Sequence, residues 1–357
     1  MQENRVSLLK QKNHIPLTVL SIILCIVLSP VVGSFMLMPQ VLTLLPVALM
    51  VLLAFVGPVS AAACAAVLIV LVYSLFGGWA ALCMALLLIP TVAASVVTLE
   101  RGEAFWTAAA AGCVAMFASM GAALGLLSAL AGSDIVTALT DIMRQMLSSY
   151  GALGDFLLAM LLQAGAVAAP EGFDAAAGIL SIDEATRAQM LSSLVLMMDS
   201  MLRLEIPLQM ATGSIAAGVF GQAALRIGAR KKGIEAEYPP LRTWRVPKGW
   251  GRILGGTLLL LFVISQFLPE ATSTMLYVFS GVFDQVFALQ GIASLCYLLH
   301  DHGKKPRWQA LVFILGYTLL RSPAVMVGIF DQGIDITHRR EKLDQDENPF
   351  DPRKNII

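Results

Sequence analysis

Charged residues are scarce in this chain. Only 13% of its 357 residues are Asp, Glu, Lys or Arg, against 57% hydrophobic residues, whereas soluble domains carry roughly a quarter charged residues. So few charges exclude a soluble globular domain, which could not cover its surface with polar groups. The net charge of zero gives no reason to expect nucleic acid as a partner. The composition therefore predicts a membrane protein.

Cysteine is also rare, and no two cysteines form a C-x-x-C pair. We therefore expect no disulfide framework and no metal site. The chain contains no P-loop, no G-x-S-x-G and no H-E-x-x-H motif, so no enzymatic activity and no cofactor are predicted. The cysteines lie inside apolar stretches and are interpreted as buried hydrophobic side chains: Cys25, Cys64, Cys83, Cys113 and Cys296.

Long apolar runs are what the chain does have. A spanning helix needs about 20 apolar residues, and short Gly or Pro breaks between runs predict antiparallel neighbours. The first run follows a basic segment without a clear cleavage site, so it is interpreted as an uncleaved helix. Residues 1–131 are predicted to hold the N-terminal tail and five transmembrane helices, near Pro16–Met36, Val41–Val56, Ser60–Phe76, Trp79–Val97 and Phe105–Ala131.

Residues 132–205 are more polar and predict an external amphipathic helical insertion. Ser181 and Glu184 fit a capping box, which predicts a helix running toward Leu204. On that helix, Asp199 and Arg203 are four residues apart and are expected to pair. A separate sixth span is predicted over residues 206–225, where small residues four apart, such as Ser214 and Gly218, favour close helix packing.

Residues 226–252 form the most basic segment and are predicted to be a cytoplasmic loop, because short basic loops stay inside. The basic N-terminal tail is expected on the same side, with six spans between the two. The insertion at 132–205 then lies outside. These signs together predict a multi-pass protein of the bacterial inner membrane with a cytoplasmic N-terminus.

Residues 253–336 are predicted to hold the remaining transmembrane helices, near Ile253–Leu268, Thr272–Leu299 and Trp308–Ile329. The last run contains Arg321 and Pro323, so it either crosses once or bends at Pro323 and returns. The polar tail at 337–357 is expected to be disordered. The predicted fold class is all-α, a polytopic transmembrane helical bundle of about 8–10 spans with an external amphipathic helical insertion.

Ionisable residues at membrane depth are functional candidates, because burying them is costly. We predict a small-solute site at Asp284, Gln290, Arg321 and Asp331, with Arg321 pairing with Asp284 or Asp331 beside a polar cavity. The alternative is that Arg321 and Asp331 reach the two membrane interfaces.

The basic loop supplies a second set of candidates: Arg230, Lys231, Lys232, Trp244 and Arg245. These side chains are expected to contact either anionic lipid headgroups or a cytoplasmic protein partner. Prolines on both sides of Trp244 stiffen the loop, which is unusual for a simple spacer.

Three short motifs carry a resemblance to a known family. They are Pro240-Leu241-Arg242-Thr243-Trp244-Arg245-Val246-Pro247, Gln290-Gly291, and Gly328-Ile329-Phe330-Asp331 followed by Arg339-Arg340. The chain resembles the YybS-like family of predicted bacterial membrane proteins of unknown function. That family is likened to the substrate-binding subunits of energy-coupling-factor transporters, so the resemblance implies small-molecule binding in a helical bundle.

Two functions follow as hypotheses. The first is transporter-like binding or translocation of a small solute. The alternative is a membrane scaffold or assembly factor that docks a cytoplasmic partner through residues 226–252. The lipid bilayer is the expected surrounding in both.

Overall fold

The computed structural model describes residues 18–20, 23, 39–149, 184–234 and 236–334. The regular elements in these ranges are all helices, which confirms the all-α bundle. The first four long helices are α2 (Pro39–Phe55), α3 (Pro58–Phe76), α4 (Gly78–Glu100) and α5 (Phe105–Ala131). Most of the predicted first span, residues 150–183 with Ser181, and the tail from 337 lie outside the described residues.

The breaks between α2 and α5 lie where glycine and proline predict them. Gly57 (φ 139°) and Gly77 (φ 86°) adopt backbone angles that glycine tolerates best, and each separates two antiparallel helices. Pro58 opens α3, where its missing N–H costs nothing. The bounds of α2 to α4 agree with the predicted runs within three residues, and those of α5 are identical.

α8 (Glu184–Lys231) corrects the predicted boundary between residues 205 and 206. A single 48-residue helix joins the end of the insertion to the predicted sixth span. Pro207 lies inside this helix. Close to this proline, the Gln209 amide of α8 and the Tyr277 hydroxyl of α10 (Pro269–Asp301) both donate to the Glu205 carboxylate, at 3.3 and 2.6 Å.

The second half of α8 packs through the small residues that the sequence indicated. A Cβ atom at Gly218 would overlap the Ala109 carbonyl and the Cys113 sulfur of α5, so only glycine permits this approach. Gln222 donates from Nε2 to the Ser95 carbonyl of α4 at 2.9 Å. Close packing of α8 against both neighbours is therefore confirmed.

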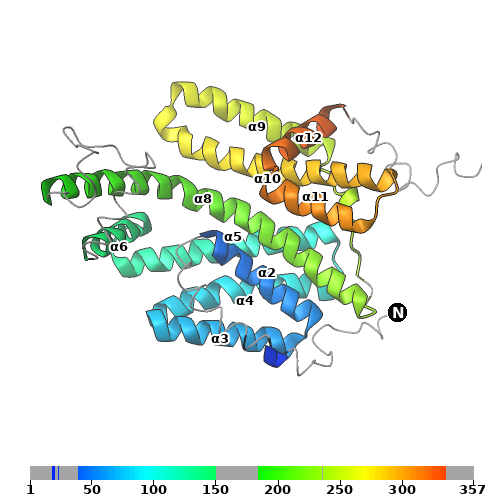
Figure 1. Cartoon of the computed structure of the whole chain (residues 1–357), viewed down its shortest axis with the longest axis horizontal. Helices are drawn as coiled ribbons and strands as arrows, with labels where there is room; N and C mark the ends of the chain where they lie inside the picture. The colour runs from blue at the N-terminus through cyan, green and yellow to red at the C-terminus, as the bar shows by residue number, and fades with distance from the viewer. Residues whose placement is uncertain (1–17, 21–22, 24–38, 150–183, 235, 335–357) are drawn as a thin grey trace, which may run out of the picture.

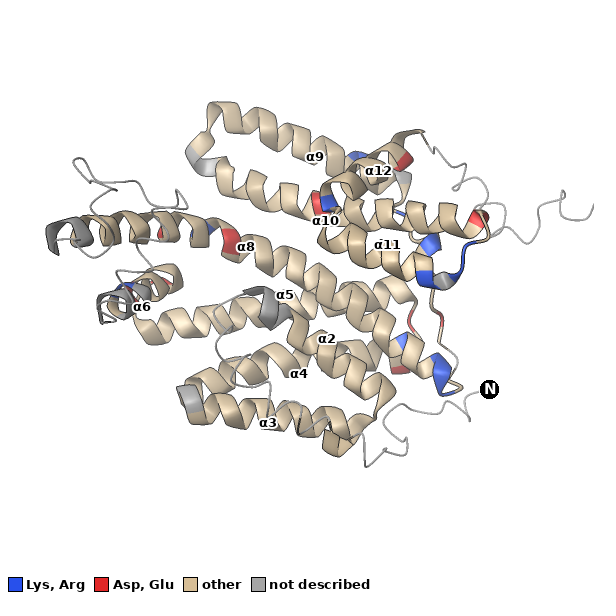
Figure 2. Ribbon diagram, viewed as in Figure 1, with Lys and Arg blue, Asp and Glu red and all other residues tan. Residues whose placement is uncertain are grey.

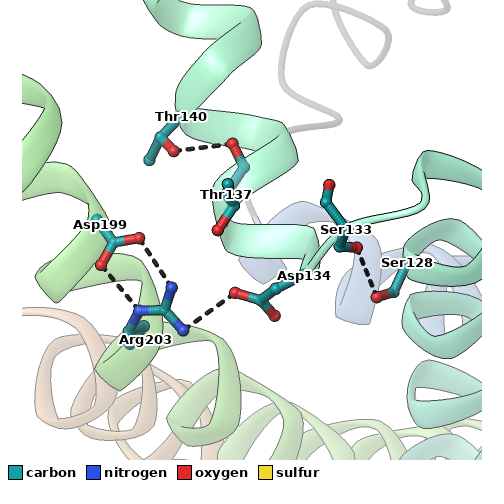
Figure 3. A network of polar contacts seen from close by, with 7 residues as sticks. All are labelled: Ser128, Ser133, Asp134, Thr137, Thr140, Asp199 and Arg203. Carbon is teal, nitrogen blue, oxygen red and sulfur yellow. Dashed lines mark hydrogen bonds and ion pairs between the residues drawn. The ribbon is translucent and has the colours of Figure 1, made fainter.

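The other end of α8 lies beside α6 (Ile135–Ser149). Figure 3 shows the ion pairs of Arg203 at this end: it donates to Asp199 of the same helix at 2.8 and 3.0 Å, and it lies 3.0 Å from Asp134, the residue before α6. The predicted Asp199–Arg203 pair is confirmed. Because these side chains are half-exposed, water screens each ion pair and its contribution to stability is small.

The C-terminal half consists of α9 (Lys248–Phe267), α10 (Pro269–Asp301), α11 (Pro306–Thr318) and α12 (Arg321–Ile334). The predicted last span is α11 and α12, bent by 108° at Leu319–Leu320 rather than at Pro323. Pro323 lies in the first turn of α12, where its missing N–H needs no helical partner.

Two ends of the bundle are distinct. The α4–α5 turn, the segment after α8 and the α10–α11 turn lie at one end, here named the loop end, and α6 lies at the other (Figure 1). This alternation agrees with the predicted order of spans. Figure 2 shows many Lys and Arg positions at the loop end, together with some Asp and Glu positions, and few charged positions in the middle of the bundle.

Four described helices are long and apolar enough to cross a membrane: α4, α5, α9 and α10. The bent pair of α11 and α12 makes a fifth candidate if it is one span, and α2 and α3 are shorter apolar helices. Many large apolar side chains on the outer surface are exposed, among them Leu259, Phe262 and Phe267 of α9. Such a surface fits lipid rather than water.

Candidate functional site: a pocket beneath the basic loop

Gln290 joins three parts of the structure. Its amide nitrogen lies 3.1 Å from the Gly328 carbonyl, 3.1 Å from Asp331 Oδ2 and 3.1 Å from Gln332 Oε1. Its carbonyl oxygen accepts a hydrogen bond from the Val246 N–H at 3.2 Å. Gln290 and Asp331, both predicted as site residues, are therefore brought together, and Gln290 also fastens the basic loop to α10.

Glycines explain why these groups can meet. A Cβ atom at Gly291 would overlap the Ala324 carbonyl of α12, and one at Gly328 would overlap the Phe287 carbonyl of α10. The two helices therefore cross with their backbones in direct contact. The Gln290-Gly291 and Gly328-x-x-Asp331 motifs form one packed crossing.

Asp284 and Arg321 do not join this crossing. Their charges interact with each other, but both residues are exposed at the surface of the bundle. No ion pair within 4 Å links them in the part of the chain that the structure describes. The predicted buried pair is thus wrong, because α12 begins at Arg321 on the outer face and buries Asp331 three turns later.

The basic loop is folded against the bundle rather than projecting from it. A short 3₁₀ turn, η4 (Leu241–Thr243), places Trp244 inside, only 4% exposed, with its indole N–H donating to the Pro239 carbonyl at 2.8 Å. The structure thus encloses the Trp244 side chain within the protein, and its predicted contact with lipid headgroups or a cytoplasmic partner stays a prediction. Arg230 and Lys231 are exposed and remain predicted lipid or partner contacts. Lys232 is half-buried, and burial lowers the pKa of its ammonium.

Arg226 anchors this fold, and the sequence prediction treated it only as one more loop charge. It is 1% exposed, and its guanidinium donates to the Glu237 carbonyl of the loop and the Glu103 carbonyl before α5, both at 2.6 Å. It also lies 5.8 Å from the centre of the Phe105 ring. The sequence did contain a signal for the burial of Arg226. Four residues at four-residue spacing lie on one helix face, namely Ser214, Gly218, Gln222 and Arg226.

Aromatic rings fill the space around this anchor. Phe105, Trp106, Tyr238 and Trp244 form an aromatic cluster, with Phe105 central: its ring centre lies 4.9, 6.0 and 5.4 Å from the other three. The contacts of Phe105 with Trp106 and Tyr238 are edge-to-face, a geometry that stabilises beyond the area it buries. Burial raises the pKa of Tyr238, which keeps its hydroxyl neutral. The cluster joins the start of α5 to the loop.

A pocket of about 410 Å³ opens beside the cluster, between the two halves of the protein, and is here named the loop pocket. Its walls are mostly apolar, and Arg245 is the ionisable residue among them. α5, α8, the loop, α9 and α10 all contribute to it. The lining residues are Trp106, Ile215, Val219, Trp244, Arg245, Val246, Pro247, Trp250, Val286, Leu289 and Gln290.

The loop pocket brings together three predicted site residues, drawn from both predicted sets. Gln290 comes from the late helices, and Trp244 and Arg245 come from the basic loop. A concave, mainly apolar space with a few converging polar groups has the character of small-molecule sites, and its volume falls in their usual range. No group of three or more His, Cys, Asp or Glu side chains gathers as a metal site among the described residues.

Taken together, these features define a polytopic α-helical membrane protein whose halves are joined at the loop end. No curated protein and no solved structure matches the chain. A family model does match, over residues 17–332, and it is described as "Predicted membrane protein (DUF2232)". The chain belongs to this family, in agreement with the resemblance to the YybS-like membrane proteins.

Proposed function

We propose that this protein binds a small organic molecule in the loop pocket, as a transporter-like solute-binding membrane protein. The observation that carries the proposal is the convergence of Trp244, Arg245 and Gln290 on one mainly apolar pocket between the two halves. A ligand there would contact α5, α8 and α10 together. Its binding would therefore favour one packing arrangement of α5 and α8 against α10.

Filling the pocket should remove binding. Val286 lines the pocket and is half-buried, so Val286→Phe places a phenyl ring where the ligand would lie. We expect at least one of indole, indole-3-acetate, tryptamine and decanoate to raise the melting temperature of the purified wild-type protein. The Val286→Phe variant should lose this shift, with affinity reduced about tenfold or more, as for steric exclusion worth roughly 1.4 kcal/mol.

Val263→Phe is the matched control, because Val263 is exposed on the outer face of α9 and the same ring there meets no pocket. Asp284→Ala should also leave the shift intact, since Asp284 does not line the loop pocket. The absence of any shift in the wild-type protein, or equal shifts in both phenylalanine variants, would refute the proposed site.

We further propose that the protein lies in the bacterial inner membrane with its loop end in the cytoplasm. The support is the gathering of Lys and Arg at that end (Figure 2). In a cysteine-free background, Arg230→Cys should react with a membrane-impermeant maleimide only after cells are permeabilised. Ser133→Cys, at the α6 end, should react in intact cells; the opposite pattern would reverse the orientation.

A further inference from the structure

We infer that the loop pocket takes the hydrocarbon chain of a membrane phospholipid, which enters from the leaflet on the loop side and is recognised by its chain rather than by the charge of its headgroup. This inference rests on the proposed function and names the class of ligand.

The polar side chains that line the pocket are already engaged within the protein. The Gln290 amide nitrogen bonds to α12 and its oxygen accepts from the loop, and the Trp244 indole N–H donates to the Pro239 carbonyl. Arg245 also has an interaction partner in the protein. A ligand that took these groups for itself would break contacts that the fold uses, which is costly for buried polar groups. The charge of a ligand is therefore not what the pocket selects.

The walls of the pocket offer hydrocarbon instead. Ile215 and Val219 of α8 line it, together with Val286 and Leu289 of α10, and all four side chains are aliphatic. Each methylene that leaves water for such walls raises affinity about fourfold. A compact polar solute gains nothing from these walls, whereas a long alkyl chain gains along its whole length.

The depth of the pocket matches one leaflet of a bilayer. Arg226 lies beside the Phe105 ring at the start of α5, and Ile215 is eleven residues before it on α8. At 1.5 Å per residue, the pocket wall at Ile215 lies about 16 Å deeper along the helix axis. Half of a typical hydrocarbon core is about 15 Å thick, so a chain from the adjoining leaflet can fill the pocket.

The mouth of the pocket faces the membrane surface. Trp106, at the start of α5, is 49% exposed, and Trp250, at the start of α9, is 62% exposed; both line the pocket. Tryptophans at the ends of spanning helices lie at the level of the lipid headgroups. Ile253, one turn after Trp250, is exposed on the apolar outer face of α9. The pocket is therefore continuous with the lipid-facing surface.

Quenching by brominated lipid chains tests whether a chain enters the pocket. Trp244 lines the pocket yet is only 4% exposed, so its ring is shielded from lipid outside the protein. A variant carrying Trp79→Phe, Trp106→Phe, Trp250→Phe and Trp308→Phe keeps it as the sole tryptophan. In nanodiscs of brominated phosphatidylcholine we expect its fluorescence to be strongly quenched relative to unbrominated lipid. Brominated phosphatidylglycerol should quench it equally.

Matched variants place the quencher in the pocket. In the same background, Val286→Phe should abolish the quenching, and Val263→Phe, on the exposed outer face of α9, should keep it. Native mass spectrometry adds a readout with all tryptophans in place: one phospholipid should be retained by the wild-type protein and by Val263→Phe, and none by Val286→Phe. If the variant with a single tryptophan does not fold, this readout decides. Unquenched Trp244 without retained phospholipid, quenching that survives Val286→Phe, or quenching by the anionic lipid alone overturns the inference.

Soluble probes separate this inference from the proposed function. Decanoate and hexanoate carry the same carboxylate and differ only in chain length, so at equal concentration only decanoate should raise the melting temperature. Decanol has no charge and should raise it as well. If indole or tryptamine gives a shift that Val286→Phe removes, while the decyl probes give none and Trp244 stays unquenched, the chain inference fails and the proposed function stands. If Val286→Phe changes neither the thermal shift nor the quenching, both fail.

Discussion

Replacing Gly291 by alanine should be among the most destabilising single-methyl changes in this protein. The added Cβ would overlap the Ala324 carbonyl oxygen and lie 2.8 Å from its carbon and 2.9 Å from the Gly328 nitrogen. These atoms belong to the α12 backbone, which cannot rotate away as a side chain does. Overpacking typically costs about 1–3 kcal/mol, and sometimes more, and here it must push two helices apart.

The separation would also break polar contacts. Gln290 is adjacent to Gly291, and its bonds to Gly328 and Asp331 are 3.1 Å long. Moving α12 outward lengthens them and leaves Asp331, which is 1% exposed, buried with weaker pairing. We therefore expect a drop of several degrees in the temperature at which half of the purified protein remains monodisperse by size-exclusion chromatography.

Two glycines supply controls for this change. A Cβ at Gly256 of α9 meets nothing within 4 Å, so Gly256→Ala should be neutral or stabilising by up to about 1 kcal/mol. A Cβ at Gly251 would overlap only the Gln332 side chain, which can move. Gly328→Ala, which presses on the Phe287 backbone, should match Gly291→Ala. A crossing that accepts both alanines without loss would contradict the close contact described here.

The sequence predicted the helices of the first half well, and the reason is local. Each of their ends depends on a glycine, a proline or a short run of charges, as at Gly57-Pro58, Gly77 and Glu100-Arg101. Such signals act within one turn of chain and can be read without knowing what packs against them. The sequence also indicated that the basic segments after α8 and after α10 share one end of the bundle, and Figure 2 shows both there.

α8 and the bend before α12 show where local signals fail. The sequence analysis placed a boundary between residues 205 and 206, yet α8 runs through it, and Tyr277 of α10, far along the chain, donates to the Glu205 carboxylate there. Conversely, Pro323 predicts a bend that occurs at Leu319–Leu320, where the residues themselves favour helix. Tertiary contacts decide both positions, and one sequence does not state them.

The candidate site shows the same contrast between what local sequence signals predict and what tertiary contacts decide. The sequence singled out Gln290, Asp331, Trp244 and Arg245 correctly as unusual residues, because polar or aromatic side chains stand out in an apolar chain. It did not predict that Gln290 and Arg245 line one pocket, since they come from different halves of the protein. It also assigned Asp284 and Arg321 to the interior, where hydropathy alone cannot distinguish a buried face from a lipid-facing one.

Replacing Arg226 by methionine should release the basic loop from the bundle. Methionine keeps much of the side-chain volume but donates no hydrogen bond, so the carbonyls of Glu103 and Glu237 lose their 2.6 Å partners. Hydrogen bonds to charged groups contribute about 1.5–3 kcal/mol each, so we expect a loss of roughly 3 kcal/mol. The desolvation of the buried guanidinium offsets part of this. Arg226→Lys should fall between, because an ammonium cannot fork to both carbonyls.

Loop release has a specific signature that general unfolding lacks. Trp244 should become exposed, shifting its fluorescence to longer wavelength, and trypsin should cut after Arg242 and Arg245 while α4 and α5 stay intact. Arg230→Met is the matched control, since Arg230 is one turn further along α8 and exposed, and it should change neither readout. Trp106 and Trp244 of the aromatic cluster line the loop pocket. Arg226→Met should therefore also remove the thermal shift that pocket ligands cause. Retention of that shift in a variant with a protease-sensitive loop would show that the pocket forms without its anchor, and that Arg226 serves stability alone.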